Sequence, residues 1–529
     1  MQIYCTENEY ITPAVRYTID FLLNRAGFFF RWEKEETLQE NSGIVLSYGK
    51  KTRFARKPSI HLPRIYDLAK LSGEEPEWHE FTINDTTLPV LGLSKSSAEP
   101  VPFDLTATVF FFISRLEEKD FRRPDDADSR YKNSLLYRYG QFQQPLTDIL
   151  SFWLAEKIIK LFRESGLPYL LKSDFPGGKQ MGLALTHDVD ITRVYHPLHR
   201  HFLQWKSPRK KQDILRAEEE IWAFDRLLPF YREKGWTATF NFLARPWENT
   251  HYRYNLKSPR FRQLLKRLQE EGHEIGLHPS RYAFEHPQRY VKERRRLETA
   301  AGQTIWGMRQ HYLRALFPTL WKQVEHIGLK YDATLAYRRQ SGFRAGVCAP
   351  FNCFDFRENR ALDCMEFPTA FFESSLPENV GNEAREIEAI EHFFAITQKY
   401  RGLLTVLWHP SNMYHHPQRS RLWNEIIKRI EIYHPYLVTL KQHYNWQKAR
   451  EGMSIDFLPT KDNLLTIKIK TKEPAQNIDV VLYGATDRVI GPDGTISLNK
   501  AEQRQGRRLE TDKEELNLQI MILKKRHHS

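Results

Sequence analysis

Two aspartates follow directly on a short apolar run near the middle of the chain. Residues 181–185 have the composition of a buried strand, and His187, Asp188 and Asp190 come immediately after them. Side chains of a strand alternate between its faces, so Asp188 and Asp190 should point to the same side at its C-terminal end. In α/β proteins that end is where ligands bind. Because two close carboxylates repel, we expect a cation, a general base, or both, at this point.

Other strands predicted in the same region also end in polar side chains. A single buried histidine is more often a hydrogen-bonded core residue than a ligand. The recurrence of such residues at successive strand ends favours a functional site instead. The residues concerned are His278 (followed by Ser280 and Tyr282), Arg309, His311, Asp332 and His409.

These residues lie on an alternation of strands and helices, which predicts a parallel sheet or a barrel. The apolar periodicity predicts strands over 236–243, 273–278, 307–311 and 403–409. It predicts helices over 217–231, 261–271, 286–301 and 383–400.

The length of 529 residues predicts two or three domains, at roughly 150 residues each. We expect a mixed α/β accessory domain over 1–175, with a strand at 44–48 and an amphipathic helix at 145–162. A Pro-Gly-Gly linker at 176–178 would lead into the α/β region of 176–450. Alternating apolar residues at 464–470, 478–483 and 516–523 predict a small β-rich domain over 451–529.

The order of the motifs resembles that of the NodB-homology polysaccharide deacetylases, metal-dependent carbohydrate esterases built on an irregular (β/α) barrel. Residues 186–190 (THDVD) resemble the first motif of the family, and 278–280 (HPS) its metal-histidine motif. Arg309 resembles the arginine that holds the base, and Asp332 the acidic residue of the fourth motif. Residues 407–409 (LWH) resemble the last motif, and the resemblance covers about 181–444. Residues 110–118 also resemble a leader domain attached to a divergent bacterial branch of the family.

The resemblance implies a role for each of these residues. Asp188 would be the general base, kept ionised by Arg309, and Asp190 and His278 would bind a divalent metal ion, with zinc expected. His409 would protonate the leaving group, and Asp332 is the candidate to orient it. Tyr282 and His311 are candidates for contacts with the substrate or the oxyanion.

One position departs from the pattern of the family. The second motif of the family ends in another histidine, which completes an Asp-His-His set of ligands, and the residue there is Tyr282. Catalytic zinc usually has three protein ligands, so a third must come from elsewhere, or the metal is absent. The candidates are His187, His286, His311 and Asp188. His187 is the least favoured because it points to the other face of the strand.

These features predict a deacetylase that removes an N- or O-acetyl group from a sugar or a polysaccharide precursor. The alternative is a catalytically degenerate barrel that binds carbohydrate or acts as a scaffold, which the missing histidine favours. A nucleic-acid-binding protein is a third reading that only the net charge of +13 supports, since no nucleic-acid motif is present.

The composition and the N-terminal residues give expectations for the cellular location and the binding partners. Four cysteines in so long a chain argue against a disulfide-built secreted fold, and they are expected to be free. The first ten residues lack the pattern of a signal peptide, and the cytoplasm is the expected location. A lipid- or nucleotide-linked sugar would suit that location. The basic residues between 193 and 211 would suit an anionic partner or a membrane surface.

Overall fold

The structure is a computed structural model of the whole chain. It describes residues 2–39, 43–52, 58–73, 75–94, 99–123, 132, 134–192, 208–244, 254–376, 383–459, 464–470, 478–483, 488–491, 494–497, 507–511 and 515–521.

A ten-stranded, mostly parallel sheet organises the central region. Nine strands follow one path, and a tenth, β17 (Tyr436–Leu437), pairs with β8. Only β13 and β14 run antiparallel among the described pairs of this sheet. The path is β13 (Phe351–Asp355), β14 (Arg360–Glu366), β12 (Tyr331–Asp332), β11 (Gly307–Met308), β10 (Glu274–His278), β9 (Thr239–Leu243), β8 (Gly182–Val189), β16 (Leu403–Leu407) and β15 (Thr369–Phe372).

All residues of β8 are buried, as are those of its neighbours β9 and β16. Strands covered on both faces need such continuous apolar runs, so the prediction of an α/β fold with a parallel sheet is confirmed. The helices of this region are α7 (Pro208–Trp222), α8 (Phe224–Lys234), α9 (Pro259–Glu270), α10 (Gln288–Ala301), α11 (Thr319–His326), α12 (Glu383–Lys399), α13 (Pro417–Tyr433) and α14 (Leu440–Glu451).

Two of the predicted elements differ from the structure. The helix predicted over 217–231 is two helices, α7 and α8, because Ala223 between them has a φ of 51°. The strand predicted over 307–311 ends at Met308, and His311–Leu313 form a short 3-10 helix (η5) instead. Two residues of that turn, Tyr312 and Leu313, have positive φ, which takes the chain out of the sheet.

The N-terminal region is a second α/β unit. Its four strands are parallel in the order β2 (Phe30–Lys34), β1 (Ile3–Glu7), β3 (Ile44–Tyr48), β4 (Ser59–Leu62). A hairpin follows, and α1 packs against α2 and α5. The hairpin consists of β5 (Trp78–Ile83) and β6 (Thr86–Leu91). The helices of this region are α1 (Pro13–Arg25), α2 (Leu105–Ile113), α4 (Leu135–Arg138), α5 (Leu146–Glu164) and the short 3-10 helix η3 (Leu116–Glu118).

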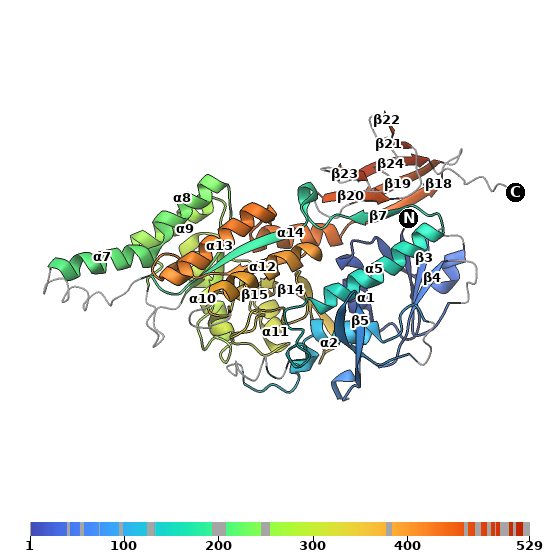
Figure 1. The fold of residues 1–529 in the computed structure, drawn as a ribbon, viewed down its shortest axis with the longest axis horizontal. Coiled ribbons are helices and arrows are strands. Elements are labelled where there is room, and N and C mark those ends of the chain that lie inside the picture. Colours follow the sequence, from blue (N-terminus) through green and yellow to red (C-terminus); the bar gives the residue numbers. More distant parts are fainter. Residues whose placement is uncertain are drawn as a thin grey trace.

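The N-terminal region packs directly on the central sheet. The ring of Phe354 on β13 lies 4.7 Å from that of Tyr17 on α1 and 5.4 Å from that of Phe110 on α2. One continuous hydrophobic core therefore includes residues of both regions. In Figure 1 the blue N-terminal elements lie at one end of the molecule, and α7 and α8 lie at the other.

The C-terminal region consists of antiparallel strands, as the alternating pattern predicts. One sheet has the order β18 (Ser454–Pro459), β19 (Leu464–Lys470), β24 (Glu515–Met521), β21 (Arg488–Gly491), β22 (Gly494–Ser497). A second has the order β23 (Arg507–Thr511), β20 (Ile478–Tyr483), β7 (Tyr169–Lys172). Because β7 precedes the expected boundary at 175, the three-domain division stays a prediction.

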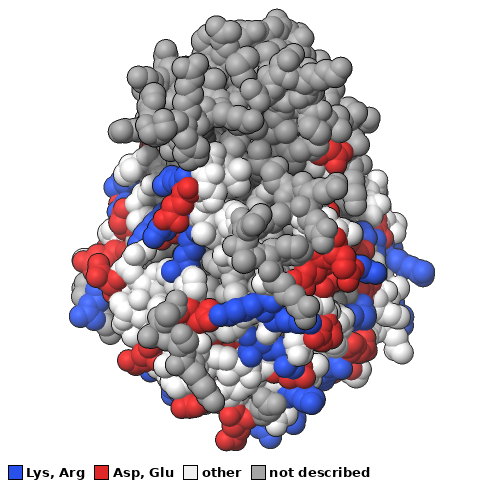
Figure 2. All heavy atoms as spheres, turned by 90° about the vertical axis from the view of Figure 1, so that its right-hand side faces the viewer, with Lys and Arg blue, Asp and Glu red and all other residues white. Residues whose placement is uncertain are grey.

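Charge is mixed on the face that Figure 2 shows, where basic and acidic side chains of the described residues are interspersed. The side chains of the basic cluster between 193 and 211 lie outside the described residues. The four cysteines are free and buried, as expected. Among the described helices, none is long and apolar enough to cross a membrane.

Candidate active site

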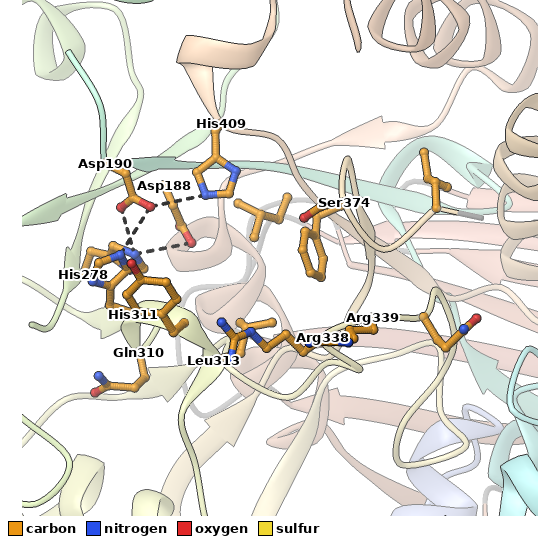
Figure 3. Close-up of a pocket in the computed structure, with 15 residues that line it drawn as sticks. Asp188, Asp190, His278, Gln310, His311, Leu313, Arg338, Arg339, Ser374 and His409 are labelled. Carbon is orange, nitrogen blue, oxygen red and sulfur yellow. Dashed lines mark ion pairs between the residues drawn. The ribbon is translucent and has the colours of Figure 1, made fainter. Parts of the chain in front are cut away.

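A cavity of about 610 Å³ opens where the strands of the central sheet end. Its floor comes from the ends of four strands of this sheet: Asp188 and Asp190 at β8, His278 at β10, His311 after β11 and His409 after β16. Figure 3 shows these five side chains converging on one side of the cavity. The carboxyl ends of parallel strands thus bring together residues that lie far apart in sequence.

Asp190, His278 and His311 form a group able to hold a metal ion. Their ligand atoms all lie within 4.8 Å of one another. One oxygen of Asp190 is 3.2 Å from Nε2 of His278, and the other is 3.4 Å from Nε2 of His311. Donor atoms about 2.1 Å from a tetrahedral ion stand about 3.4 Å apart, so the donor set fits a zinc-like ion.

The orientation of His278 also suits a metal ligand. Its Nδ1 donates a hydrogen bond of 2.6 Å to the carbonyl of Arg309, which directs Nε2 toward Asp190. A fixed Nδ1–H with a free Nε2 is the usual arrangement of metal-binding histidines. Burial lowers the pKa of His278, but the charges of Asp188 and Asp190 outweigh burial and the net pKa is raised. This concentration of negative charge is what a cation would neutralise.

Asp188 lies next to this group and is held in place by Arg309, as predicted. One of its oxygens accepts hydrogen bonds from Nη1 of Arg309 at 3.1 Å and from the amide of Asn241 at 2.8 Å. Gly276 makes room for that amide, since a Cβ at this position would lie 2.1 Å from Oδ1 of Asn241. Burial raises the pKa of Asp188, but His278 and Arg309 outweigh it and the pKa is lowered. The carboxylate is therefore ionised at neutral pH.

The carboxylate that orients His409 is Glu373, and not the predicted Asp332. Nδ1 of His409 donates a hydrogen bond of 2.5 Å to Glu373, and Asn412 donates another to the same oxygen. Nε2 of His409 lies 3.5 Å from Asp190, which places His409 at the rim of the metal-ligand group. Burial lowers the pKa of His409, but Glu373 and Asp190 raise it well above its usual value. His409 therefore carries a proton at neutral pH.

Asp332 lies within the sheet, away from His409. Thr334 donates a hydrogen bond to it, and its neighbour across the ladder is Glu366. Burial raises the pKa of Asp332 to about 6 and raises that of Glu366 well above its usual value. Glu366 also accepts a hydrogen bond from the backbone of Leu335, which follows β12.

Tyr282, His286 and His187, which were also predicted as candidates, do not line the cavity. Tyr282 is 46% exposed and is not among the residues that line the cavity, so its contact with substrate or oxyanion stays a prediction. His286 is exposed. His187 faces away from the site, as expected. Its Nδ1 donates to the carbonyl of Trp408, and its Nε2 accepts from the hydroxyl of Tyr231.

Several residues of the site carried no motif in the sequence. Glu373 follows β15 directly, and the position of a carboxylate after an apolar strand is the signal that identifies it in retrospect. Asn241 lies inside β9, where a polar residue within an apolar run gives a similar signal. Arg338 and Arg339 lie on a loop with no periodicity, and only the structure shows that they line the cavity.

Residues 1–163 match the model of a family of unknown function, DUF7033. No curated protein matches the chain. Several solved structures align with about half of it at low identity, and three of them are described next.

One is a putative polysaccharide deacetylase from Mycobacterium smegmatis, with 17% identity and a TM-score of 0.37. The alignment covers 53% of this chain and 94% of the other. A probable polysaccharide deacetylase from Pseudomonas aeruginosa PAO1 has 12% identity and a TM-score of 0.37, with coverages of 51% and 92%. Puue allantoinase has 11% identity and a TM-score of 0.38, with coverages of 51% and 91%. At these values the chemistry of the site has to be judged from its own residues.

Proposed function

We propose that this protein is a metal-dependent deacetylase that hydrolyses an N- or O-acetyl group of a carbohydrate. The observation that carries the proposal is the arrangement of three groups around one cavity. A potential metal site lies between an ionised carboxylate, Asp188, and a protonated imidazole, His409. A module that only binds sugar has no need for such an acid–base pair.

The metal ion would be held by Asp190, His278 and His311. Zinc or a similar ion at this place supplies Lewis-acid chemistry, since it lowers the pKa of water and polarises a carbonyl group. The remaining steps depend on side chains of the chain itself.

Asp188 is placed to take a proton from the attacking water. Its second oxygen faces the metal-ligand group, 3.8 Å from Nε2 of His278, while the first is occupied by Arg309 and Asn241. The two hydrogen bonds fix the carboxylate and keep it ionised, so it is ready to act as a general base.

His409 is placed to give a proton to the leaving group. The bond from Nδ1 to Glu373 fixes the ring and directs Nε2 into the cavity. Expulsion of an amine or alkoxide from a tetrahedral intermediate requires a proton donor, and a histidine with a raised pKa holds a proton for it at neutral pH.

The choice of an acetylated carbohydrate has a different basis. It comes from the resemblance of the motifs to polysaccharide deacetylases, and the names of two aligned structures are consistent with it.

The test is the release of acetate from a panel of acetylated sugars. The panel contains N-acetylglucosamine, chitooligosaccharides and acetylated xylan, and the protein is assayed after treatment with a chelator and after addition of Zn²⁺, Co²⁺ or Mn²⁺. We expect metal-dependent release that the Asp188→Asn variant lowers by roughly 10²–10⁴-fold. Asp363→Asn is the matched control, because that side chain is 64% exposed and lies on β14.

If the protein binds sugars of the panel and releases no acetate under any metal, the catalytic proposal is wrong. The degenerate carbohydrate-binding barrel would then be the better account.

A further inference from the structure

Another cavity, of about 940 Å³, lies beside the end of β9. Its described lining residues come from the end of β9, from residues 254–257 and from helices α9 and α10. None of them is shared with the cavity of the candidate active site. The two helices contact each other, and Figure 1 shows them in the part of the molecule away from the N-terminal elements. This cavity is therefore a separate feature of the central region.

The side chains around this second cavity give it a positive charge. Four basic residues line it, namely Lys257, Arg262 on α9, and Arg295 and Arg296 on α10, and all four are exposed. Among the described lining residues none is acidic. Within the part of the chain that the structure describes, the four side chains form no ion pair and no hydrogen bond. Their charge is available to a ligand.

The arginine that precedes this pair on α10 differs from them. Arg294 contacts Glu298 at 2.8 Å, four positions further along the helix, which is a spacing at which opposite charges on a helix pair. At the same spacing Arg295 and Arg296 have a threonine and an alanine, and both of these small residues line the cavity. The sequence of α10 therefore pairs one arginine internally and leaves two beside the cavity.

The floor of the second cavity is apolar and aromatic. Leu243, Ala244 and Leu256 are at most 8% exposed. The ring of Tyr254 stacks on that of Phe261, with centroids 4.5 Å apart and planes inclined by 8°. Positive charges above such a floor are screened less than charges on an open surface, because the field lines pass through a medium of low dielectric constant. The attraction for an anion is correspondingly stronger.

Tyr254 connects this floor to the candidate active site. Its hydroxyl donates a hydrogen bond of 2.7 Å to the carbonyl of Val189, which lies between Asp188 and Asp190 in the chain. The same hydroxyl accepts a bond of 2.7 Å from the backbone of Leu243. Burial raises the pKa of Tyr254 well above its usual value, and the charges of Asp190 and Asp188 raise it further. A ligand in the second cavity would therefore lie next to the strand end that carries the two aspartates.

We propose that the second cavity binds the diphosphate group of a ligand. Four positive charges without an acidic neighbour in the lining favour a ligand with several negative charges, whereas one carboxylate would balance only one of them. Three of the four residues are arginines, whose planar donors pair with two phosphate oxygens at a time. The volume of about 940 Å³ is within the ~300–1,000 Å³ usual for ligand pockets, so it has room for an organic group beside the phosphates.

This inference goes beyond the proposed function and does not depend on it. A diphosphate can belong to a soluble ester or to the headgroup of a lipid, and the chemistry of recognition is the same for both.

The first experiment compares inorganic pyrophosphate with inorganic phosphate by isothermal titration calorimetry. The full chain is used without added metal, because pyrophosphate chelates divalent ions. We expect pyrophosphate to bind about 10-fold or more tightly than phosphate, since its second phosphate group forms additional charge-assisted hydrogen bonds. Equal affinity for the two anions, or no binding of pyrophosphate, would overturn the inference.

Two pairs of substitutions then locate the binding. Arg295→Gln with Arg296→Gln should lower the affinity for pyrophosphate by roughly 10–100-fold, as expected for lost hydrogen bonds to a charged group. Lys257→Gln with Arg262→Gln should have a similar effect and tests the same cavity from a different segment. All four positions are exposed, so the fold should tolerate the changes, and circular dichroism verifies this.

The matched control is Arg163→Gln with Arg357→Gln, which removes the same charge from two exposed positions outside the cavity. It should keep the affinity of the wild type. Unchanged affinity in both cavity variants, or an equal loss in the control, would show that pyrophosphate does not bind at this place and would reject the proposal.

Sedimentation with vesicles distinguishes the two sources of the phosphate groups. The vesicles contain either phosphatidylcholine alone or an equimolar mixture of phosphatidylcholine and phosphatidic acid. Pyrophosphate binding together with arginine-dependent sedimentation on the mixed vesicles assigns the cavity to a lipid headgroup, and pyrophosphate binding without sedimentation assigns it to a soluble ester. Sedimentation without pyrophosphate binding would contradict the proposal, because it would reflect attraction to a charged surface alone. None of these measurements uses acetate release, so this proposal and the proposed function can fail separately.

Discussion

His311 is expected to be the third protein ligand of the metal, and its removal is the sharpest test of the site. Nε2 of His311 lies 3.4 Å from Asp190, and its ring centre lies 4.8 Å from that of His278. The substitution His311→Ala leaves an aspartate and a single histidine, which is one ligand short of the usual catalytic zinc site.

The size of the effect follows from the energetics of zinc binding. Four-ligand zinc sites bind with about 10–16 kcal/mol, so an equal share for one ligand is about 2.5–4 kcal/mol. The dissociation constant for Zn²⁺ should therefore rise by roughly 10²–10³-fold. Tyr282→Phe should leave it unchanged, because the tyrosine is 46% exposed and lies outside the cavity.

The assay is competition for Zn²⁺ with a chromophoric chelator, with circular dichroism to verify that each variant is folded. Wild-type affinity in His311→Ala would refute the assignment of this ligand. A large loss in Tyr282→Phe would show that the loop around Tyr282 closes over the metal, and that the ligand set has been derived from the wrong conformation.

Three further predictions concern buried carboxylates. Glu373→Gln should lower the pKa of His409, so that acetate release against pH declines at a lower pH on its alkaline side. Glu118→Gln should lower the free energy of unfolding in urea by about 3–5 kcal/mol, because Arg115 and Arg344 lose their buried counter-charge. Burial raises the pKa of Glu274 from 4.5 to about 7, so the folded state binds this proton more tightly than the unfolded chain. The free energy of unfolding should therefore fall by up to ~3 kcal/mol as the pH rises from 4.5 to about 7. Urea titrations of the Glu274→Gln variant over the same pH range should show no such fall.

The sequence was sufficient to bring Asp188, Asp190 and Arg309 together at the ends of the central strands. The alternation of side chains along β8 places Asp188 and Asp190 on the face opposite His187, as the structure has them. Contacts between strand ends, such as that of Arg309 with Asp188, follow from the same parallel sheet.

The sequence was insufficient to predict which carboxylate contacts His409. Asp332 ends the short strand β12, Glu373 follows the strand β15, and both are acidic, so the pattern alone does not show which of them reaches His409. The structure separates them because β15 lies next to β16, which leads directly to His409, whereas β12 lies on the other side of β8 in the strand order. The order of strands in the sheet, which is not the order in the chain, decides the contact.

The same reasoning explains the departure at Tyr282. Strands β10 and β11 are parallel neighbours with Leu277 opposite Met308, so the segments that follow them run side by side. The backbone nitrogen of His311 accordingly donates to the carbonyl of Pro279, and this brings the imidazole next to His278. Metal binding depends on the positions of the donor atoms and not on their order in the sequence. His311, from the adjacent strand end, can therefore replace the histidine that the family has at position 282. The tyrosine in the second motif is therefore compatible with a complete set of three ligands, and the loss of that histidine is no argument for a degenerate site.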